Sequence, residues 1–123
     1  MTDANAKGKA LFVGADIFLG TMVAQAAQKG GFSCQSALPS KVYATVAEDP
    51  SIRAIVADLK EAKEFLKDIV DSASVGGHPV LIAITFHTDL ESKRQAQEAG
   101  FEYILHRSQI SSLLPQILSE KRF

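Results

Sequence analysis

The strongest constraint on this chain is a regular alternation between short apolar runs and segments whose apolar residues recur at helical spacing. The apolar runs that predict strands are Ala10–Val13, Phe32–Ala37, Ile52–Leu59, Pro79–Ile84 and Tyr103–His106. Helices are predicted over 19–27, 40–48, 61–74, 88–99 and after Ser111. The run at 79–84 is continuous rather than alternating, so we expect it to form a central strand covered on both faces.

Five strand–helix units with short connections predict an α/β protein, because this alternation produces a parallel sheet with helices on both faces. The natural arrangement is a five-stranded sheet of the flavodoxin type, with strand order 2-1-3-4-5. A chain of 123 residues is long enough for one such domain. We expect the domain to span 9–120, with a flexible N-terminal segment over 1–8 and a tail over 121–123.

Three residues predict where the later helices begin and end. Thr88 and Glu91 have the spacing of a capping box at a helix start, and Gly100 suits a left-handed helix stop. Ser111 is expected to cap the last helix, which would place Pro115 near the first turn, where proline is tolerated.

Charge and cysteine content exclude several classes of protein. Thirteen basic and fourteen acidic side chains leave a formal charge of −1, so binding to nucleic acid or to an anionic membrane is not expected. A single cysteine, Cys34, excludes a disulfide framework. The N-terminus has no signal-peptide pattern, and the longest apolar stretch is too short to cross a bilayer. We therefore expect a cytoplasmic protein.

Polar residues stand at the predicted carboxyl ends of three strands, the edge where ligands collect in such folds. Asp58, Thr85 and Arg107 supply a carboxylate, a hydroxyl and a fixed cation. Together they could handle a phosphoryl group, with the carboxylate accepting it and the other two contacting its oxygens. The alternative is structural, with Asp58 capping the next helix and Arg107 pairing with it.

The same positions resemble the receiver domain of two-component response regulators, over nearly the whole chain from Lys9 to Leu118. Asp58 matches the phospho-accepting aspartate that closes the third strand, and Thr85 matches the hydroxyl residue that ends the fourth. Gly100 matches the glycine after the fourth helix, and Arg107 stands where receivers have a lysine. The resemblance implies a receiver fold and a role in signal transduction.

The sequence departs from the receiver pattern at the metal site. Receivers bind Mg²⁺ with two acidic residues after the first strand, and Gly14 and Ala15 stand there instead. Only Asp16 remains beside Asp58 as a metal ligand. The remaining positions expected to line the site are Lys60, whose ammonium could approach the metal position, and His87, which either faces solvent or tunes Asp58.

These features together predict a stand-alone receiver-like signalling protein that is not an enzyme. We expect it to dock on a protein, either a histidine kinase or a downstream signalling protein, with weak or no Mg²⁺-dependent phosphorylation at Asp58. No cofactor is expected, and Mg²⁺ only if the phosphorylation site functions. The alternative function is that of a phospho-accepting single-domain response regulator. In either case the protein could form a homodimer. Ile17 and Phe18 either contact a partner or staple the first helix.

A second class of protein is suggested by the turn after the first strand. Gly14 and Gly20, with Ile17 between them, resemble the glycine-rich turn of short-chain-dehydrogenase-like nucleotide binders. In this alternative the chain is a small flavodoxin-like or Rossmann-like domain that binds a nucleotide or an anion. Arg107, Lys60 and the backbone amides near Gly14 would hold the ligand.

Overall fold

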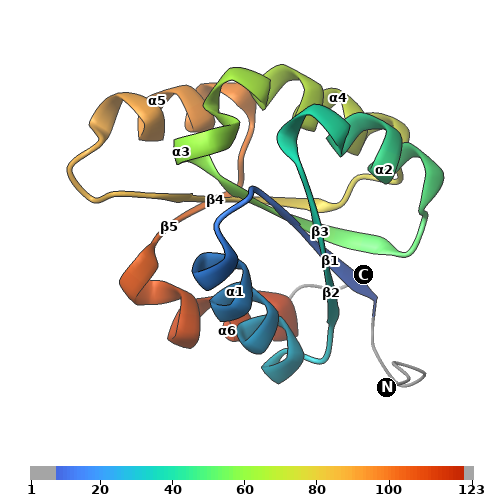
Figure 1. Cartoon of the computed structure of the whole chain (residues 1–123), viewed down its shortest axis with the longest axis horizontal. Coiled ribbons are helices and arrows are strands. Elements are labelled where there is room, and N and C mark those ends of the chain that lie inside the picture. The colour runs from blue at the N-terminus through green and yellow to red at the C-terminus, as the bar shows by residue number, and fades with distance from the viewer. Residues whose placement is uncertain (1–7, 121–123) are drawn as a thin grey trace.

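The computed structural model describes residues 8–120, so the N-terminal segment expected over 1–8, apart from Gly8, and the tail expected over 121–123 lie outside it. Five parallel strands form one sheet in the order β2-β1-β3-β4-β5, as predicted (Figure 1). The strands are β1 Lys9–Val13, β2 Ser33–Ala37, β3 Ile52–Asp58, β4 Val80–Thr85 and β5 Tyr103–His106. In this part of the chain no helix is long and apolar enough to span a bilayer.

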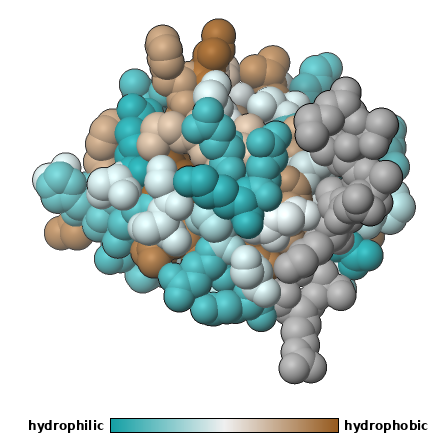
Figure 2. Space-filling view, turned by 90° about the horizontal axis from the view of Figure 1, so that it is seen from below, coloured by the Kyte–Doolittle hydropathy of each residue, from teal (hydrophilic) through white to brown (hydrophobic). Residues whose placement is uncertain are grey.

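Helices cover both faces of the sheet, with α1 and α6 on one face and α2, α3, α4 and α5 on the other (Figure 1). Their bounds are α1 Ile17–Lys29, α2 Val42–Glu48, α3 Leu59–Ala62, α4 Leu66–Val75, α5 Leu90–Ala99 and α6 Ile110–Glu120. Short 3₁₀ turns are η1 Pro39–Lys41, η2 Lys63–Phe65 and η3 Arg107–Gln109. Seen from the α1 and α6 side, the surface is largely hydrophilic, with hydrophobic residues at the upper margin and smaller hydrophobic areas elsewhere (Figure 2).

Two hydrophobic cores lie on the two faces of the sheet, because successive strand side chains point in opposite directions. Phe12 and Ile82 pack beneath α1 and α6, whereas Leu11 and Leu81 pack beneath the other helices. All six residues of β4 are buried, which confirms the expectation that 79–84 forms a central strand. Each fully buried Leu, Ile or Phe side chain contributes about 1.5–3 kcal/mol, so both layers hold the strand ends in place.

The predicted single helix over 61–74 is wrong. The chain forms α3 directly after β3, passes through η2 and then forms α4, because the backbone leaves helical geometry at Ala62 and again at Phe65. The apolar positions keep helical spacing across this break, so the sequence pattern does not reveal it. Because α3 begins at Leu59, Asp58 stands at the N-cap position, and Leu59 and Lys60 lie in the first turn of the helix that follows it.

Two predicted helix starts are also wrong. Asp89, not Thr88, caps α5, since its carboxylate accepts a hydrogen bond from the Ser92 backbone amide at 3.1 Å. Ser111 lies inside α6, which follows η3 without a break, and Pro115 is therefore well inside the helix. Gly100 does end α5 in the left-handed conformation, with φ 113°.

The α1–α6 contact depends on a glycine at the end of α1. A Cβ at Gly30 would lie 2.9 Å from the Leu118 Cβ and 3.2 Å from the Pro115 carbonyl oxygen. Both contacts are with α6, the helix that continues from Arg107 and η3. This close approach therefore sets the position of α6 against α1.

We predict that Gly30→Ala lowers the free energy of unfolding by about 1–3 kcal/mol, because the added methyl group overpacks the α1–α6 contact. Gly20→Ala is the matched control, since a Cβ there meets the Phe12 ring at 3.4 Å, an ordinary contact. Alanine within α1 should be neutral or stabilising by up to about 1 kcal/mol. Urea denaturation of both variants measures the difference, and equal effects at the two glycines would contradict this packing argument.

Candidate functional site

Asp58 ends β3 at the carboxyl edge of the sheet and is 5% exposed. Its carboxylate Oδ1 accepts a hydrogen bond from the Lys60 backbone amide at 3.1 Å and caps α3. The structural alternative from the sequence is thus half correct. Asp58 caps the next helix, but its carboxylate forms no ion pair within residues 8–120.

Arg107 pairs with a different aspartate. Its Nη2 donates to the Asp16 Oδ2 at 3.1 Å, and the other Asp16 oxygen accepts from the Leu19 backbone amide at 3.0 Å. The Leu19 hydrogen bond, and after it the Arg107 guanidinium, hold the pKa of Asp16 below its usual range. Both oxygens of Asp16 are therefore engaged in capping α1 and in joining α1 to the end of β5.

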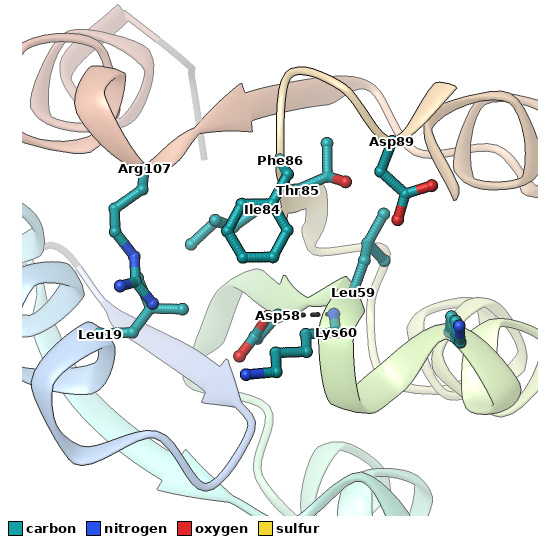
Figure 3. Close-up of a pocket in the computed structure, with 10 residues that line it drawn as sticks. Leu19, Asp58, Leu59, Lys60, Ile84, Thr85, Phe86, Asp89 and Arg107 are labelled. Atoms are coloured by element: carbon teal, nitrogen blue, oxygen red, sulfur yellow. Dashed lines mark hydrogen bonds between the residues drawn. The ribbon is translucent and has the colours of Figure 1, made fainter. Parts of the chain in front are cut away.

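A pocket of about 120 Å³ lies between the ends of β3, β4 and β5. Its charged or polar lining is Asp58, Lys60, Lys63, Thr85, Asp89 and Arg107, and its apolar lining is Leu19, Leu59, Ile84 and Phe86. Figure 3 shows the Phe86 ring on the side of Asp58 and Lys60 and the Thr85 side chain on the side of Asp89, with Arg107 and Asp89 at opposite ends. The structure therefore brings Asp58, Thr85, Arg107 and Lys60 to one pocket.

His87 and Asp16 lie outside this pocket lining. The His87 ring packs edge-on against His106, with ring centroids 5.8 Å apart. The prediction that His87 lines the pocket is therefore wrong. Sequence reasoning missed the pocket residues Lys63 and Asp89. The break between α3 and α4 brings Lys63 to the pocket, and the cap of α5 brings Asp89 there.

The electrostatic surroundings of Asp58 disfavour its charged form. Burial raises the pKa of Asp58 above its ordinary value of 3.8, and the Glu61 and Asp16 carboxylates raise it further. The Lys60 amide and the Arg107 guanidinium act in the opposite direction without cancelling the rise. A desolvated acid whose pKa is raised in this way is a common sign of a functional position.

Glu61 is the main functional candidate that the sequence reasoning missed. Its Oε2 accepts a hydrogen bond from the Ala15 backbone amide at 2.7 Å, which joins α3 to the turn after β1. The only signal in the sequence is that Glu61 lies one helical turn after Asp58. The contact also depends on α3 beginning at Leu59, which the sequence did not predict.

The position of Gly14 is tight for any side chain. A Cβ there would lie 3.0 Å from the Phe12 ring and 3.2 Å from the Asp58 Cβ. The Gly14 amide already donates to the Ala37 carbonyl at 3.0 Å. An acidic residue at this position, one of the two where receivers carry an acid, would therefore require the Phe12 ring or the Asp58 side chain to shift.

The donors at this edge do not fit Mg²⁺. This ion prefers octahedral oxygen ligands with help from carboxylates. Asp16 is engaged by Arg107 and Leu19, and Glu61 is engaged by the Ala15 amide. Between residues 8 and 120, no three acidic, histidine or cysteine side chains converge as a metal site would require.

The turn after β1 does not fit an anion either. Glycine-rich phosphate sites need free backbone amides. Here the Gly14 amide binds a carbonyl and the Ala15 amide binds the Glu61 carboxylate, which would repel a phosphate. These contacts argue against nucleotide or anion binding by the amides near Gly14.

Neither a family model nor a curated protein matches the sequence, whereas solved structures match the fold. A response regulator from Thermotoga maritima has a TM-score of 0.76 at 15% identity, over 94% of this chain and 99% of that one. The chemotaxis response regulator CheY4 of Vibrio cholerae gives 0.70 at 17% identity, over 91% and 99%. A CheY-like receiver domain protein from Methanospirillum hungatei gives 0.71 at 16% identity, over 94% and 96%. The chain therefore has the flavodoxin-like fold of response regulator receiver domains.

We predict that Asp58→Asn raises the free energy of unfolding by roughly 1 kcal/mol at pH 7, because it removes a desolvated charge while the amide oxygen still caps α3. The folded-state pKa of Asp58 lies above the unfolded value of 3.8, so its ionisation destabilises the fold. The gain should therefore be full above the folded pKa and shrink as pH falls toward about 4. Urea denaturation at several pH values measures it.

Asp68→Asn is the control for this experiment, because Asp68 is an exposed carboxylate on α4. It should change stability little at any pH. A loss of stability in Asp58→Asn at pH 7, or a gain that does not depend on pH, would contradict the electrostatic argument.

Proposed function

We propose that this chain is a receiver-like signal-transduction protein that acts by docking on a protein partner, with weak or no Mg²⁺-dependent phosphorylation of Asp58. The partner would be a histidine kinase or a downstream signalling protein. The observation that carries this proposal is the closure of the metal side of the Asp58 pocket by the chain's own groups.

The signalling part of the proposal is supported by the fold. The similar structures are response regulators and receiver domains, and the resemblance in sequence extends over the same part of the chain. The residues of a receiver site are partly retained, since Asp58, Thr85 and Arg107 meet at one pocket. The fold determines where these side chains meet, and their chemistry determines what they can do there.

The absence of metal-dependent transfer is supported by three contacts. Phe12 fills the space beside Gly14, Glu61 engages the Ala15 amide, and Arg107 is paired with Asp16. Phosphoryl transfer to a carboxylate requires positive charge to neutralise the transferred group. Without a metal site, only Arg107 and the pocket lysines remain, and Arg107 would first have to leave Asp16.

The second candidate is a functional phospho-accepting regulator. One observation favours it, since only one oxygen of the Asp58 carboxylate has a hydrogen-bond partner among the described residues. The other oxygen is available on a pocket that also contains the Thr85 hydroxyl. The second oxygen of Asp58 could therefore accept a phosphoryl group without first losing a hydrogen bond to the protein.

An amide NMR titration with Mg²⁺ and then beryllofluoride, which mimics an aspartyl phosphate, separates the two candidates. We expect no saturable shifts at Asp58, Thr85 or Arg107, and no labelling of the chain by a small phosphodonor. The Thermotoga maritima response regulator, measured in parallel, shows whether the reagents are active. Shifts that depend on Mg²⁺ and disappear in Asp58→Asn would overturn the proposal in favour of a working phosphorylation site.

A further inference from the structure

Asp58 is a buried carboxylate that forms no ion pair with any residue between 8 and 120. One oxygen accepts the Lys60 amide hydrogen bond, and the second has no partner among the described residues. The charges that raise its pKa are the Glu61 and Asp16 carboxylates. Arg107, which acts in the opposite direction, is paired with Asp16 rather than with Asp58. The pocket therefore has an uncompensated negative charge at one side.

The other basic side chains of the pocket do not remove this charge. Lys63 lies near Asp89, whose pKa is lowered by hydrogen bonding from Ser92 and, to a smaller extent, by the Lys63 charge. Lys60 is exposed at the pocket and forms no ion pair in the described part of the chain. Lys60 is thus a basic neighbour that could compete for Asp58, but it forms no ion pair with it in residues 8–120.

The remaining walls suit an alkyl chain that ends in hydrogen-bond donors. Leu59 and Ile84 are buried side chains that line the pocket together with Asp58, and the exposed Phe86 side chain adds an aromatic ring to the same lining (Figure 3). Thr85 is only 7% exposed, and its hydroxyl forms no hydrogen bond with another described residue. A lysine or arginine side chain has this combination of an apolar stem and a cationic end.

Exposed apolar side chains stand next in the sequence to the pocket residues. Ile17 and Phe18 are 80% and 83% exposed and precede Leu19, whereas Leu90 is 70% exposed and follows Asp89. Phe86, which lines the pocket, is 56% exposed. Exposed apolar side chains around a charged pocket are characteristic of protein interaction sites.

We propose that the pocket at Asp58 receives a lysine or arginine side chain from a partner protein, presented on a segment with apolar neighbours. The cationic group donates to the free oxygen of Asp58, its stem lies against Leu59 and Ile84, and the flanking apolar residues contact Phe18 and Phe86. A charge-assisted hydrogen bond to a carboxylate that is itself largely buried, as Asp58 is, is stronger than the same bond between two fully exposed groups. This inference rests on the proposed docking function and names the chemistry of the partner.

The experiment is an amide NMR titration of the full chain with the capped peptide acetyl-Leu-Lys-Phe-amide, whose lysine has an apolar neighbour on each side. The matched neutral ligand carries norleucine in place of lysine, and inorganic phosphate and putrescine are titrated separately. We expect saturable shifts at Asp58, Lys60, Thr85 and Phe86 with the lysine peptide. Binding should weaken about tenfold or more with norleucine, because the charge-assisted bond is lost.

Three variants test which side chains are responsible. Asp58→Asn should weaken binding of the lysine peptide by about tenfold or more, whereas Asp68→Asn, an exposed acid on α4, should leave it unchanged. Lys60→Met should strengthen binding, because it removes the competing ammonium. A pocket for anions would show the opposite response to Lys60→Met.

Each contrary outcome overturns the assignment. Equal binding of the lysine and norleucine peptides, shifts with phosphate only, or no response to the lysine peptide would exclude a cationic partner residue. Putrescine binding as tightly as the peptide would assign the pocket to free small amines. Failure of the proposed function has a separate sign, the Mg²⁺-dependent beryllofluoride shifts, which do not depend on whether the peptide binds.

Discussion

The edge of the sheet is organised around one desolvated charge, the carboxylate of Asp58. The residue ends β3, a central strand that is covered on both faces, and the layers of helices keep it 5% exposed. A buried carboxylate without a cation costs free energy, which the hydrophobic cores beneath both helix layers offset. That cost remains in the folded protein as a raised pKa and as an oxygen with no hydrogen-bond partner among residues 8–120. Both properties support the binding role proposed for the site.

Contacts within the chain occupy the positions where a receiver holds its metal. Phe12 packs against Gly14, Glu61 binds the Ala15 amide, and Asp16 holds Arg107. Two of these contacts join other elements to the turn after β1, namely α3 through Glu61 and η3 through Arg107, so hydrogen bonds and packing maintain the arrangement at this edge. This arrangement supports the proposed docking role, which requires no change in phosphorylation.

Sequence reasoning was reliable where a single local pattern decides the outcome. The five strands, their order and the stop at Gly100 follow from apolar periodicity and from the conformational freedom of glycine. It was wrong at Thr88, where the adjacent Asp89 caps the helix instead, and at Ser111, which lies inside α6. It was also wrong at the break between α3 and α4, because apolar residues keep helical spacing across that break. Neighbouring hydroxyl and carboxylate residues cap with similar strength, so the three-dimensional path of the loop decides between them.

The sequence by itself determined the fold class and brought Asp58, Thr85 and Arg107 to one edge, because parallel strands that alternate with helices end on the same side of a sheet. Only the tertiary structure decided which charges pair. Arg107 binds Asp16 rather than Asp58, Glu61 reaches Ala15, and His87 turns toward His106. These pairings depend on distances between side chains on separate elements. Such distances are set by helix packing and by the start of α3, and a one-dimensional pattern of residues does not contain them.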